Sequence, residues 1–386
     1  MVKLMRGTLF YVMMLCAVLV STAESATLMY VANEGDHNIT VVNLDTDEII
    51  TEVPIPTGNA PHAIVFAGGK AYVNNRGSEF LTVIDTETLE VSGEILLEAI
   101  SFQLALSPDG ETIAVSYKNA LMVSFVDVAT DTISTLYLAD PPAEGFLETP
   151  MKHPHWSKDG AYLYVQNNID NQLVKVDVAS GNYVVANKIP LPGSNHDLVP
   201  SANDKIMYAV NQNTVTGTSL TVIDAEQDKI IKDIPLPLLD DEIGFGHHGG
   251  LTRNGKTFYF CNEGGRSVSL VDTVKMQVRK SIEVGNGAGH AVFAKDNQKV
   301  FIIPHKDNIV SVIDTQSEEV IENIEAGSGK KIAHSSYITD DGKYLYVINV
   351  GDQHIVKINT VTMEVVARIP VGKKALAFAV TASDEL

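Results

Sequence analysis

The sequence has few cysteines, few basic residues and almost no helical periodicity, and each shortage argues against a class of protein. Only Cys16 and Cys261 occur among 386 residues. Cys16 lies in an N-terminal apolar run that we expect to be removed, so the mature chain forms no internal disulfide and depends on a large core. Lys and Arg number 28 against 48 Asp and Glu, a formal charge of −20. This balance argues against nucleic acid as a partner, because a phosphate backbone needs a basic patch.

Several catalytic signatures are also missing. The sequence contains no P-loop, no GxSxG motif and no GxGxxG motif that opens a helix, so phosphate transfer and nicotinamide chemistry are disfavoured. It also has no CxxCH site for covalent haem attachment.

The N-terminus has the order of a secretory signal. Lys3 and Arg6 precede the apolar run TLFYVMMLCAVLV, and the small residues of VSTAESA follow. We expect residues 1–23 to be a signal peptide that is removed, and residues 24–386 to form one β-propeller domain without a membrane span. The expected location is the periplasm or the outside of the cell.

A repeat of four short apolar runs organises the rest of the chain. The clearest copy is residues 334–372, where YITDDGKYLYV, HIVKIN and VVARIPV supply four runs separated by turns. An acidic or amide residue ends the third run of each copy at 40- to 50-residue intervals, at Asp45, Asp85, Asp127, Asp177, Asp224, Asp272, Asp314 and Asn359. The repeat predicts an all-β fold, an eight-bladed β-propeller with four antiparallel strands in each blade.

The phase of the repeat predicts how the ring closes. The mature chain begins with a second strand, LMYVAN, and ends with a first strand, ALAFAV. We expect these N- and C-terminal strands to pair in one blade, which removes the free edges of an open array.

The histidines are distributed unevenly over the predicted blades. All 11 fall on the side where first strands begin, here called the upper face, and none falls in the turns of the opposite, lower face. First strands line the channel of a propeller, so a ring of imidazoles is expected at its upper mouth. The candidate cofactor and metal ligands are His62, His153, His196, His247, His248, His290 and His334.

The number of these histidines limits the chemistry. One zinc ion takes four ligands, so seven imidazoles are too many for a single structural site. Imidazole binds copper, zinc, iron and nickel. Two solutions stay open: several metal ions that share the ring, or one flat haem with one or two axial histidines.

The blade motifs resemble known propellers. The strand pattern LYVIN, HIVKIN and VVARIPVG resembles the YVTN-repeat family of exported propellers, over almost all of the chain after the signal. The histidine-rich mouth resembles the d-type haem propeller of cytochrome nitrite reductase. With its pair His247 and His248, it also resembles multi-copper propellers such as nitrous oxide reductase and thiocyanate dehydrogenase. This chain has no added cupredoxin domain, so the resemblance implies a binding mode rather than a reaction.

Three further residues are candidates for substrate or catalysis. Arg76 and Lys118 are cations on the upper face of adjacent blades and can bind a small anion or a haem carboxylate. Glu263 can serve as an acid or base, or hydrogen bond to a histidine.

We therefore expect an exported propeller that binds redox-active copper or haem through a histidine ring. It would act as an oxidoreductase or cofactor-handling protein, with a small-molecule or anionic substrate or a redox partner protein. One alternative is a YVTN scaffold without cofactor or catalysis that presents loops to a protein or cell-surface partner. Another is a lactonase- or lyase-type enzyme on the same fold. Fewer than three converging imidazoles would favour the scaffold.

Overall fold

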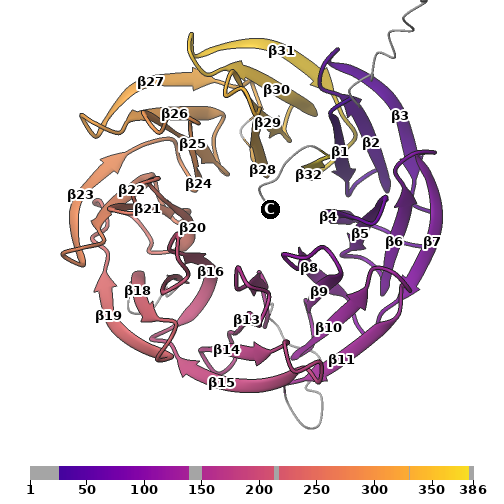
Figure 1. Cartoon of the computed structure of the whole chain (residues 1–386). Coiled ribbons are helices and arrows are strands. Elements are labelled where there is room, and N and C mark those ends of the chain that lie inside the picture. The colour runs from indigo at the N-terminus through magenta and orange to yellow at the C-terminus, as the bar shows by residue number, and fades with distance from the viewer. Residues whose placement is uncertain (1–25, 139–149, 213–216, 330, 382–386) are drawn as a thin grey trace, which may run out of the picture.

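The computed structural model describes residues 26–138, 150–212, 217–329 and 331–381. The predicted signal peptide lies outside these ranges. The described residues form eight four-stranded antiparallel sheets arranged as blades around a common axis (Figure 1). The predicted all-β, eight-bladed propeller is therefore confirmed. Among the described residues, no helix is long and apolar enough to cross a membrane.

Each blade runs from an innermost to an outermost strand. The innermost strands are β32 (Ala375–Val380), β4 (Pro61–Ala67), β8 (Ser101–Leu106), β12 (His155–Trp156), β16 (Ser194–Pro200), β20 (Gly246–Leu251), β24 (Ala288–Phe293) and β28 (Ile332–Ile338). The second strands are β1 (Leu28–Asn33), β5 (Lys70–Asn75), β9 (Thr112–Tyr117), β13 (Tyr162–Asn167), β17 (Ile206–Gln212), β21 (Thr257–Asn262), β25 (Lys299–Pro304) and β29 (Tyr344–Asn349).

The outer half of each blade completes the sheet. The third strands are β2 (Asn38–Asn43), β6 (Phe80–Asp85), β10 (Met122–Asp127), β14 (Gln172–Asp177), β18 (Ser219–Asp224), β22 (Ser267–Asp272), β26 (Ile309–Asp314) and β30 (His354–Asn359). The outermost strands are β3 (Glu48–Pro54), β7 (Glu90–Leu96), β11 (Ile133–Tyr137), β15 (Val184–Pro190), β19 (Lys229–Pro235), β23 (Gln277–Glu283), β27 (Glu319–Glu325) and β31 (Glu364–Pro370).

The burial of the strands follows from their place in the blade. Second and third strands are covered on both faces by neighbouring blades, so they are buried along most of their length, as in LMYVAN of β1 and LYVIN of β29. The outermost strands alternate exposed and partly buried residues, because one face meets solvent. Continuous apolar runs therefore mark the middle of a blade.

The two ends of the chain close the ring as predicted. β1 pairs with β32, with Met29 opposite Val380 and Val31 opposite Phe378. The Leu28 amide donates to the Thr381 hydroxyl (3.0 Å), and the Thr381 amide donates to the Leu28 carbonyl (2.9 Å). The closing blade is therefore as fully paired as the others.

The turn after the third strand forms as the sequence predicts in seven blades. In the first blade the predicted marker Asp45 is wrong: β2 ends at Asn43, whose side chain accepts from the amides of Asp45 (2.8 Å) and Thr46 (3.3 Å). The carboxylate of Asp85 accepts hydrogen bonds from the amides of Glu87 (3.0 Å) and Thr88 (2.8 Å). The side chains of Asp314 and Asn359 likewise accept hydrogen bonds from the backbone amides two and three residues further along the chain. The regular Asp marker is thus a turn residue whose side chain bonds its own backbone.

Contacts between blades alternate in character around the ring. One residue with positive φ occupies the equivalent position in each turn between third and fourth strands. In chain order these are Asp47, Leu89, Asp131, Tyr183, Asp228, Met276, Glu318 and Met363. The acidic members bind cations of the preceding blade, for example Asp47 with Lys357 (2.8 Å) and Asp131 with Lys70 (2.7 Å).

The other four interfaces are apolar at this position. Tyr183 stacks on Phe125 with ring centroids 3.9 Å apart. Leu89, Met276 and Met363 pack on the hydrophobic clusters between their blades. Ionic and apolar contacts thus alternate, and successive blades differ more than the simple repeat indicates.

We predict that Asp228→Ala destabilises the fold. Lys175, whose side chain is 9% exposed, would lose its carboxylate partner at 2.9 Å. Losing one hydrogen bond to a buried charge costs about 2 kcal/mol, measurable by urea unfolding. Glu226→Ala is the control, because the Lys205–Glu226 pair is exposed on both sides. Equal midpoints for the two variants would contradict the prediction.

Candidate metal centre

Most candidate ligands lie where innermost strands lose their regular pairing; His153 instead precedes β12, which shows no register shift. Seven of these strands, β4, β8, β16, β20, β24, β28 and β32, show a register shift against the second strand. In β16 the extra residue is His196, between Asn195 and Asp197. In β20 the shift spans His247 and His248. Because a bulge turns its residues out of the pleat, it can direct these imidazoles towards the channel.

Seven imidazoles form one compact group, here called the histidine cluster. Its members are His153, His196, His247, His248, His290, His305 and His334. Neighbouring ring centroids are 4.0 Å apart for His196 and His247 and 4.1 Å apart for His248 and His290. His62 lies at the edge, 6.3 Å from His334. Six of the seven sequence candidates are therefore brought together, with His62 beside them.

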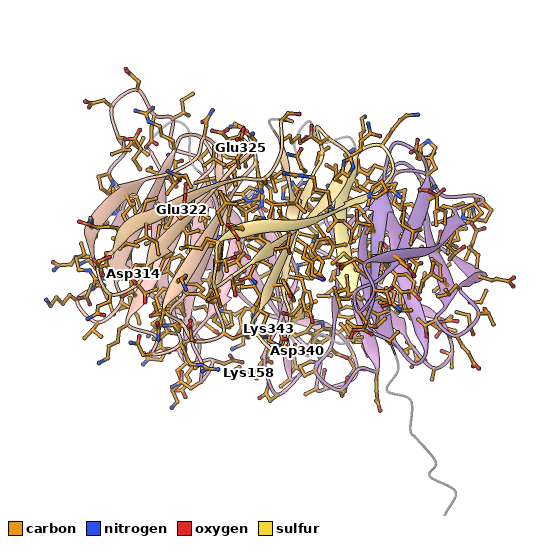
Figure 2. The ribbon with its side chains drawn as sticks, turned by 90° about the horizontal axis from the view of Figure 1, so that it is seen from above. Lys158, Asp314, Glu322, Glu325, Asp340 and Lys343 are labelled. Atoms are coloured by element: carbon orange, nitrogen blue, oxygen red, sulfur yellow. The ribbon has the colours of Figure 1, made fainter. Side chains whose placement is uncertain are left out.

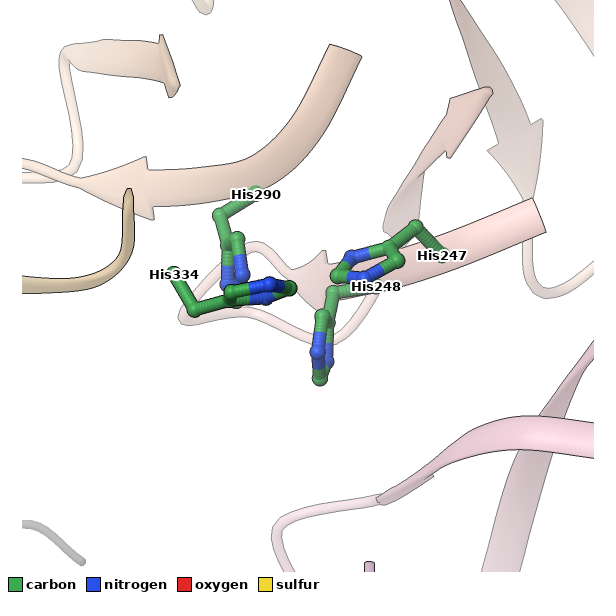
Figure 3. A group of neighbouring side chains, drawn as sticks. All are labelled: His247, His248, His290 and His334. Atoms are coloured by element: carbon green, nitrogen blue, oxygen red, sulfur yellow. The ribbon is translucent and has the colours of Figure 1, made fainter. Parts of the chain in front are cut away.

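The cluster contains three groups of possible metal ligands, each with donor atoms within 4.8 Å of one another. The first consists of His247, His248, His290 and His334, whose rings converge from β20, β24 and β28 (Figure 3). The second consists of His153, His196 and His248, and the third of His247, Glu263 and His305. His247 and His248 each belong to two groups, so together the groups hold seven imidazoles and one carboxylate.

Polar neighbours orient several of these rings. Nδ1 of His248 lies 2.9 Å from a carboxylate oxygen of Asp197. Nδ1 of His153 lies 3.3 Å from the Gln103 side-chain amide. A ring whose Nδ1 is held by a carboxylate presents Nε2 for a metal, which is the usual support for a histidine ligand.

Lys152 and Gln212 hold His196. The Lys152 ammonium lies 3.1 Å from Nδ1 of His196 and 2.7 Å from Oε1 of the Gln212 side chain. Gln212 Nε2 lies 2.9 Å from the same Nδ1. The site therefore includes a cation among its imidazoles.

Other ring nitrogens are buried without a hydrogen-bond partner among the described residues. They are Nε2 of His196, Nδ1 of His247, Nε2 of His290 and both nitrogens of His305. The carboxylate of Glu263 lies 3.5 Å from His247 and 3.7 Å from His305, too far for strong hydrogen bonds. An unpaired buried nitrogen is costly unless a ligand completes it, so this donor set fits metal ions.

Burial favours the neutral form of six cluster members by lowering the pKa values of His153, His196, His247, His290, His305 and His334. It lowers the pKa of His153 to about 3, assisted by His248. It also holds the pKa values of His196, His247, His290 and His334 well below the usual range, and neighbouring imidazoles add to the effect. Burial would raise the pKa of Asp197, but His248 and other histidines outweigh it and hold that pKa at about 2. Neutral imidazole is the form that binds metal.

The structure gives the three other candidates, Glu263, Arg76 and Lys118, different surroundings. Glu263 joins the third ligand group. Arg76 lies over the Phe102 ring at 4.2 Å and donates to the Phe102 carbonyl, and its charge helps to lower the pKa of His62. Lys118 is exposed, and the lysine placed among the histidines is Lys152.

Sequence reasoning missed four residues of the site. It noted His305 on the upper face but left it out of the ring, because His305 lies after a second strand rather than before a first. It gave no role to Asp197, Lys152 or Gln212. Asp197 follows His196 directly, and Lys152 precedes His153, so adjacency to a candidate histidine was the available signal.

Two cavities adjoin the cluster. One of about 410 Å³ is lined by Glu263, His305, Lys306, Lys331, Ile332 and His334. The other, of about 760 Å³, includes His248 and His290 and extends to residues of the lower-face turns. The cluster is therefore bordered by space on two sides.

Comparisons with known proteins support the fold. No family model and no curated protein sequence matches the chain, so the YVTN resemblance stays a prediction. Among solved structures, the chain is similar to "Dihydro-heme d1 dehydrogenase NirN in complex with DHE", with a TM-score of 0.76 and 20% identity over 90% of this chain and 73% of that one. It is also similar to the hydrazine synthase of Kuenenia stuttgartiensis, with a TM-score of 0.52 and 18% identity over 71% and 87% of the two chains. At these identities the likeness shows a shared fold.

We predict that His62 makes the metal-free protein less stable in acid. Burial and Arg76 lower its pKa from 6.5 to about 4, against the opposing effect of Glu34. Between pH 6.5 and 4 the unfolded chain therefore binds a proton that the folded chain does not, and the free energy of unfolding falls with falling pH. His62→Gln should reduce this slope by up to one proton, about 1.4 kcal/mol per pH unit. Urea unfolding at several pH values measures it.

The exposed His37 provides a matched control. His37→Gln should leave the slope close to that of the original protein. Identical slopes for His62→Gln and the original protein would contradict the prediction.

Proposed function

We propose that the protein binds two or three copper ions in the histidine cluster and performs redox chemistry there. The observation that carries this proposal is the convergence of seven imidazoles, several with buried, unpartnered nitrogens. The three ligand groups share His247 and His248, so three ions cannot each have three separate ligands. Two or three ions are the number that eight donors support.

Copper suits this donor set better than its competitors. Divalent copper binds nitrogen sites more tightly than the neighbouring first-row metals, and imidazole is one of its common ligands. The described ligand groups contain only one carboxylate, Glu263, which argues against calcium or magnesium because these ions take oxygen ligands. Bound copper would supply one-electron steps, while the chain's own residues hold the ions and exclude bulk water.

The substrate we propose is a small anion. The protein carries a formal charge of −20, yet cations gather at the cluster. Arg76 and Lys152 act on the pKa of His153, Lys331 acts on that of His305, and Lys306 acts on that of Glu263. Local positive charge in an acidic protein attracts anions to the place where it is concentrated, here beside the 410 Å³ cavity.

The alternatives fit the site less well. A scaffold without cofactor gives no reason for several buried nitrogens without partners. A lactonase or lyase needs oxygen ligands, and the described ligand groups contain only Glu263. A haem remains the second candidate, because the similar NirN structure is a complex with DHE and a 760 Å³ cavity lies beside His248 and His290. We also propose export to the periplasm or medium, on the N-terminal signal pattern, and electron exchange with a redox partner protein.

Copper reconstitution tests the main proposal. Protein incubated with Cu(II) and freed of excess metal should contain two or three copper ions per chain by elemental analysis, without a haem absorption band. His290→Gln should lower this number, because His290 belongs to the four-imidazole group. His354→Gln should not, since its Nδ1 is held by the Asp352 carbonyl and it belongs to no ligand group. Less than one ion per chain would contradict copper binding, and a haem band in protein from its native compartment would favour the second candidate.

Azide tests the proposed substrate class. Titrated into the copper-loaded protein, azide should give a ligand-to-copper absorption band, and its affinity should fall with rising salt because the attraction is electrostatic. Lys331→Met should weaken binding about threefold, the size expected for one exposed charge. Lys118→Met, which removes an exposed cation that lines neither cavity, should have no effect. Equal weakening by both variants would count against a specific anion site.

A further inference from the structure

A cavity of about 760 Å³ runs along one wall of the channel, from the histidine cluster to the lower face. Its lining comes from β20, β24 and β28 and the turns that follow them. His248 and His290 form its inner end, and Arg253, Lys295 and Asp340 form its outer end. Viewed edge-on, the ring carries Asp340 on the opposite face from Glu325, which ends a strand at the upper face (Figure 2). The cavity therefore crosses much of the propeller's height.

Its size and walls are those of a small-molecule site. Ligand pockets commonly measure about 300–1,000 Å³ and combine apolar walls with a few polar groups. Between the two ends, the cavity is lined by Leu251, Val292, Phe293, Tyr337 and Ile338. Two of these side chains are aromatic, and flat apolar molecules pack well against such rings.

The two ends offer different chemistry. At the outer end, Arg253 is exposed and Lys295 is partly exposed, with the Lys295 ammonium 4.0 Å from the Asp340 carboxylate. Among the described residues that line this end, two are cations and one is a carboxylate. At the inner end, Nε2 of His290 is buried without a hydrogen-bond partner among the described residues. A ligand whose apolar body lies along the cavity walls and whose anionic group lies at the outer end would match this arrangement.

We propose that this cavity binds a small aromatic organic anion, with its apolar body against the wall that includes Val292, Phe293 and Tyr337 and its charge at Arg253 and Lys295. This site is separate from the 410 Å³ cavity beside Lys306 and Lys331. A molecule bound there would touch the cluster through His248 and His290, so under the proposed function it is placed to exchange electrons with bound metal. Binding itself needs only the cavity, and does not depend on copper.

The probe is 8-anilinonaphthalene-1-sulfonate, which joins an aromatic body to a sulfonate. In the metal-free full chain we expect one fluorescent binding site per molecule. Val292→Trp, which fills the cavity, should weaken binding at least tenfold. The double variant Arg253→Gln with Lys295→Gln should weaken it about three- to tenfold, since each cation is at least partly exposed.

Two controls keep the test independent of folding. Lys343→Gln removes an exposed lower-face cation that lines neither cavity, and should leave affinity unchanged. The charge variants keep the cavity walls, so a loss of affinity with an unchanged unfolding midpoint cannot arise from misfolding.

Some results would overturn the proposal. One is the absence of saturable binding below 1 mM probe, since a Kd of 1 mM corresponds to a binding free energy of only about 4 kcal/mol. Another is equal affinity of the probe for Val292→Trp and the original protein. Displacement of the probe by hemin, with an absorption band of imidazole-ligated haem, would assign the cavity to a tetrapyrrole instead. Failure of copper reconstitution would leave these readings unaffected, because they use the metal-free chain.

Discussion

The pairing of β1 with β32 is the constraint on which the rest of the structure depends. A four-stranded blade buries its faces only against neighbours, so an open row of eight would leave two apolar faces and a free edge exposed. Bringing residues 28–33 and 375–380 into one sheet removes both. Closure also fixes the radius of the channel, and with it the distance across which innermost strands face one another. The histidine cluster exists because that distance is short enough for imidazoles from different blades to meet.

The site is built from local exceptions to an otherwise regular ladder. A paired residue on an innermost strand packs at least partly into the space between blades, as Val292 and Phe293 do at the edge of the 760 Å³ cavity. The register shifts at His196 and at His247–His248 release residues from this pattern. The regular part of each blade therefore supplies rigidity, and the bulges supply ligands. This division explains why a repeat with a common core can carry a site that differs from blade to blade.

The electrostatics of the cluster follow from its burial. Imidazoles packed within 4–6 Å of one another cannot all be charged, and burial favours the neutral form of rings such as His196 and His247. Neutral rings do not repel bound cations, and they leave lone pairs available. The charged groups beside the cluster have two roles. The carboxylates of Asp197 and Glu263 lie next to the rings of His248 and His247. Arg76 and Lys152 add positive charge near His153 in a protein that is acidic as a whole. The arrangement is consistent with cationic metal in the centre and an anion beside it.

The sequence by itself determined the fold, the closure of the ring and the face on which histidines gather. These features follow from short-range patterns, because strand alternation, Asp-containing turns and the phase of the repeat depend on residues that are close in the sequence.

Tertiary structure alone decided which side chains meet. His305 joins the cluster although its strand position differs, His62 stays at the edge, and Asp197 and Lys152 reach rings through contacts that no repeat spacing encodes. The alternation of ionic and apolar contacts between blades is a further case, since Asp131 pairs with Lys70 from the preceding blade. Register shifts and the curvature of the ring determine which of these side chains come into contact. Both depend on how the eight blades pack together.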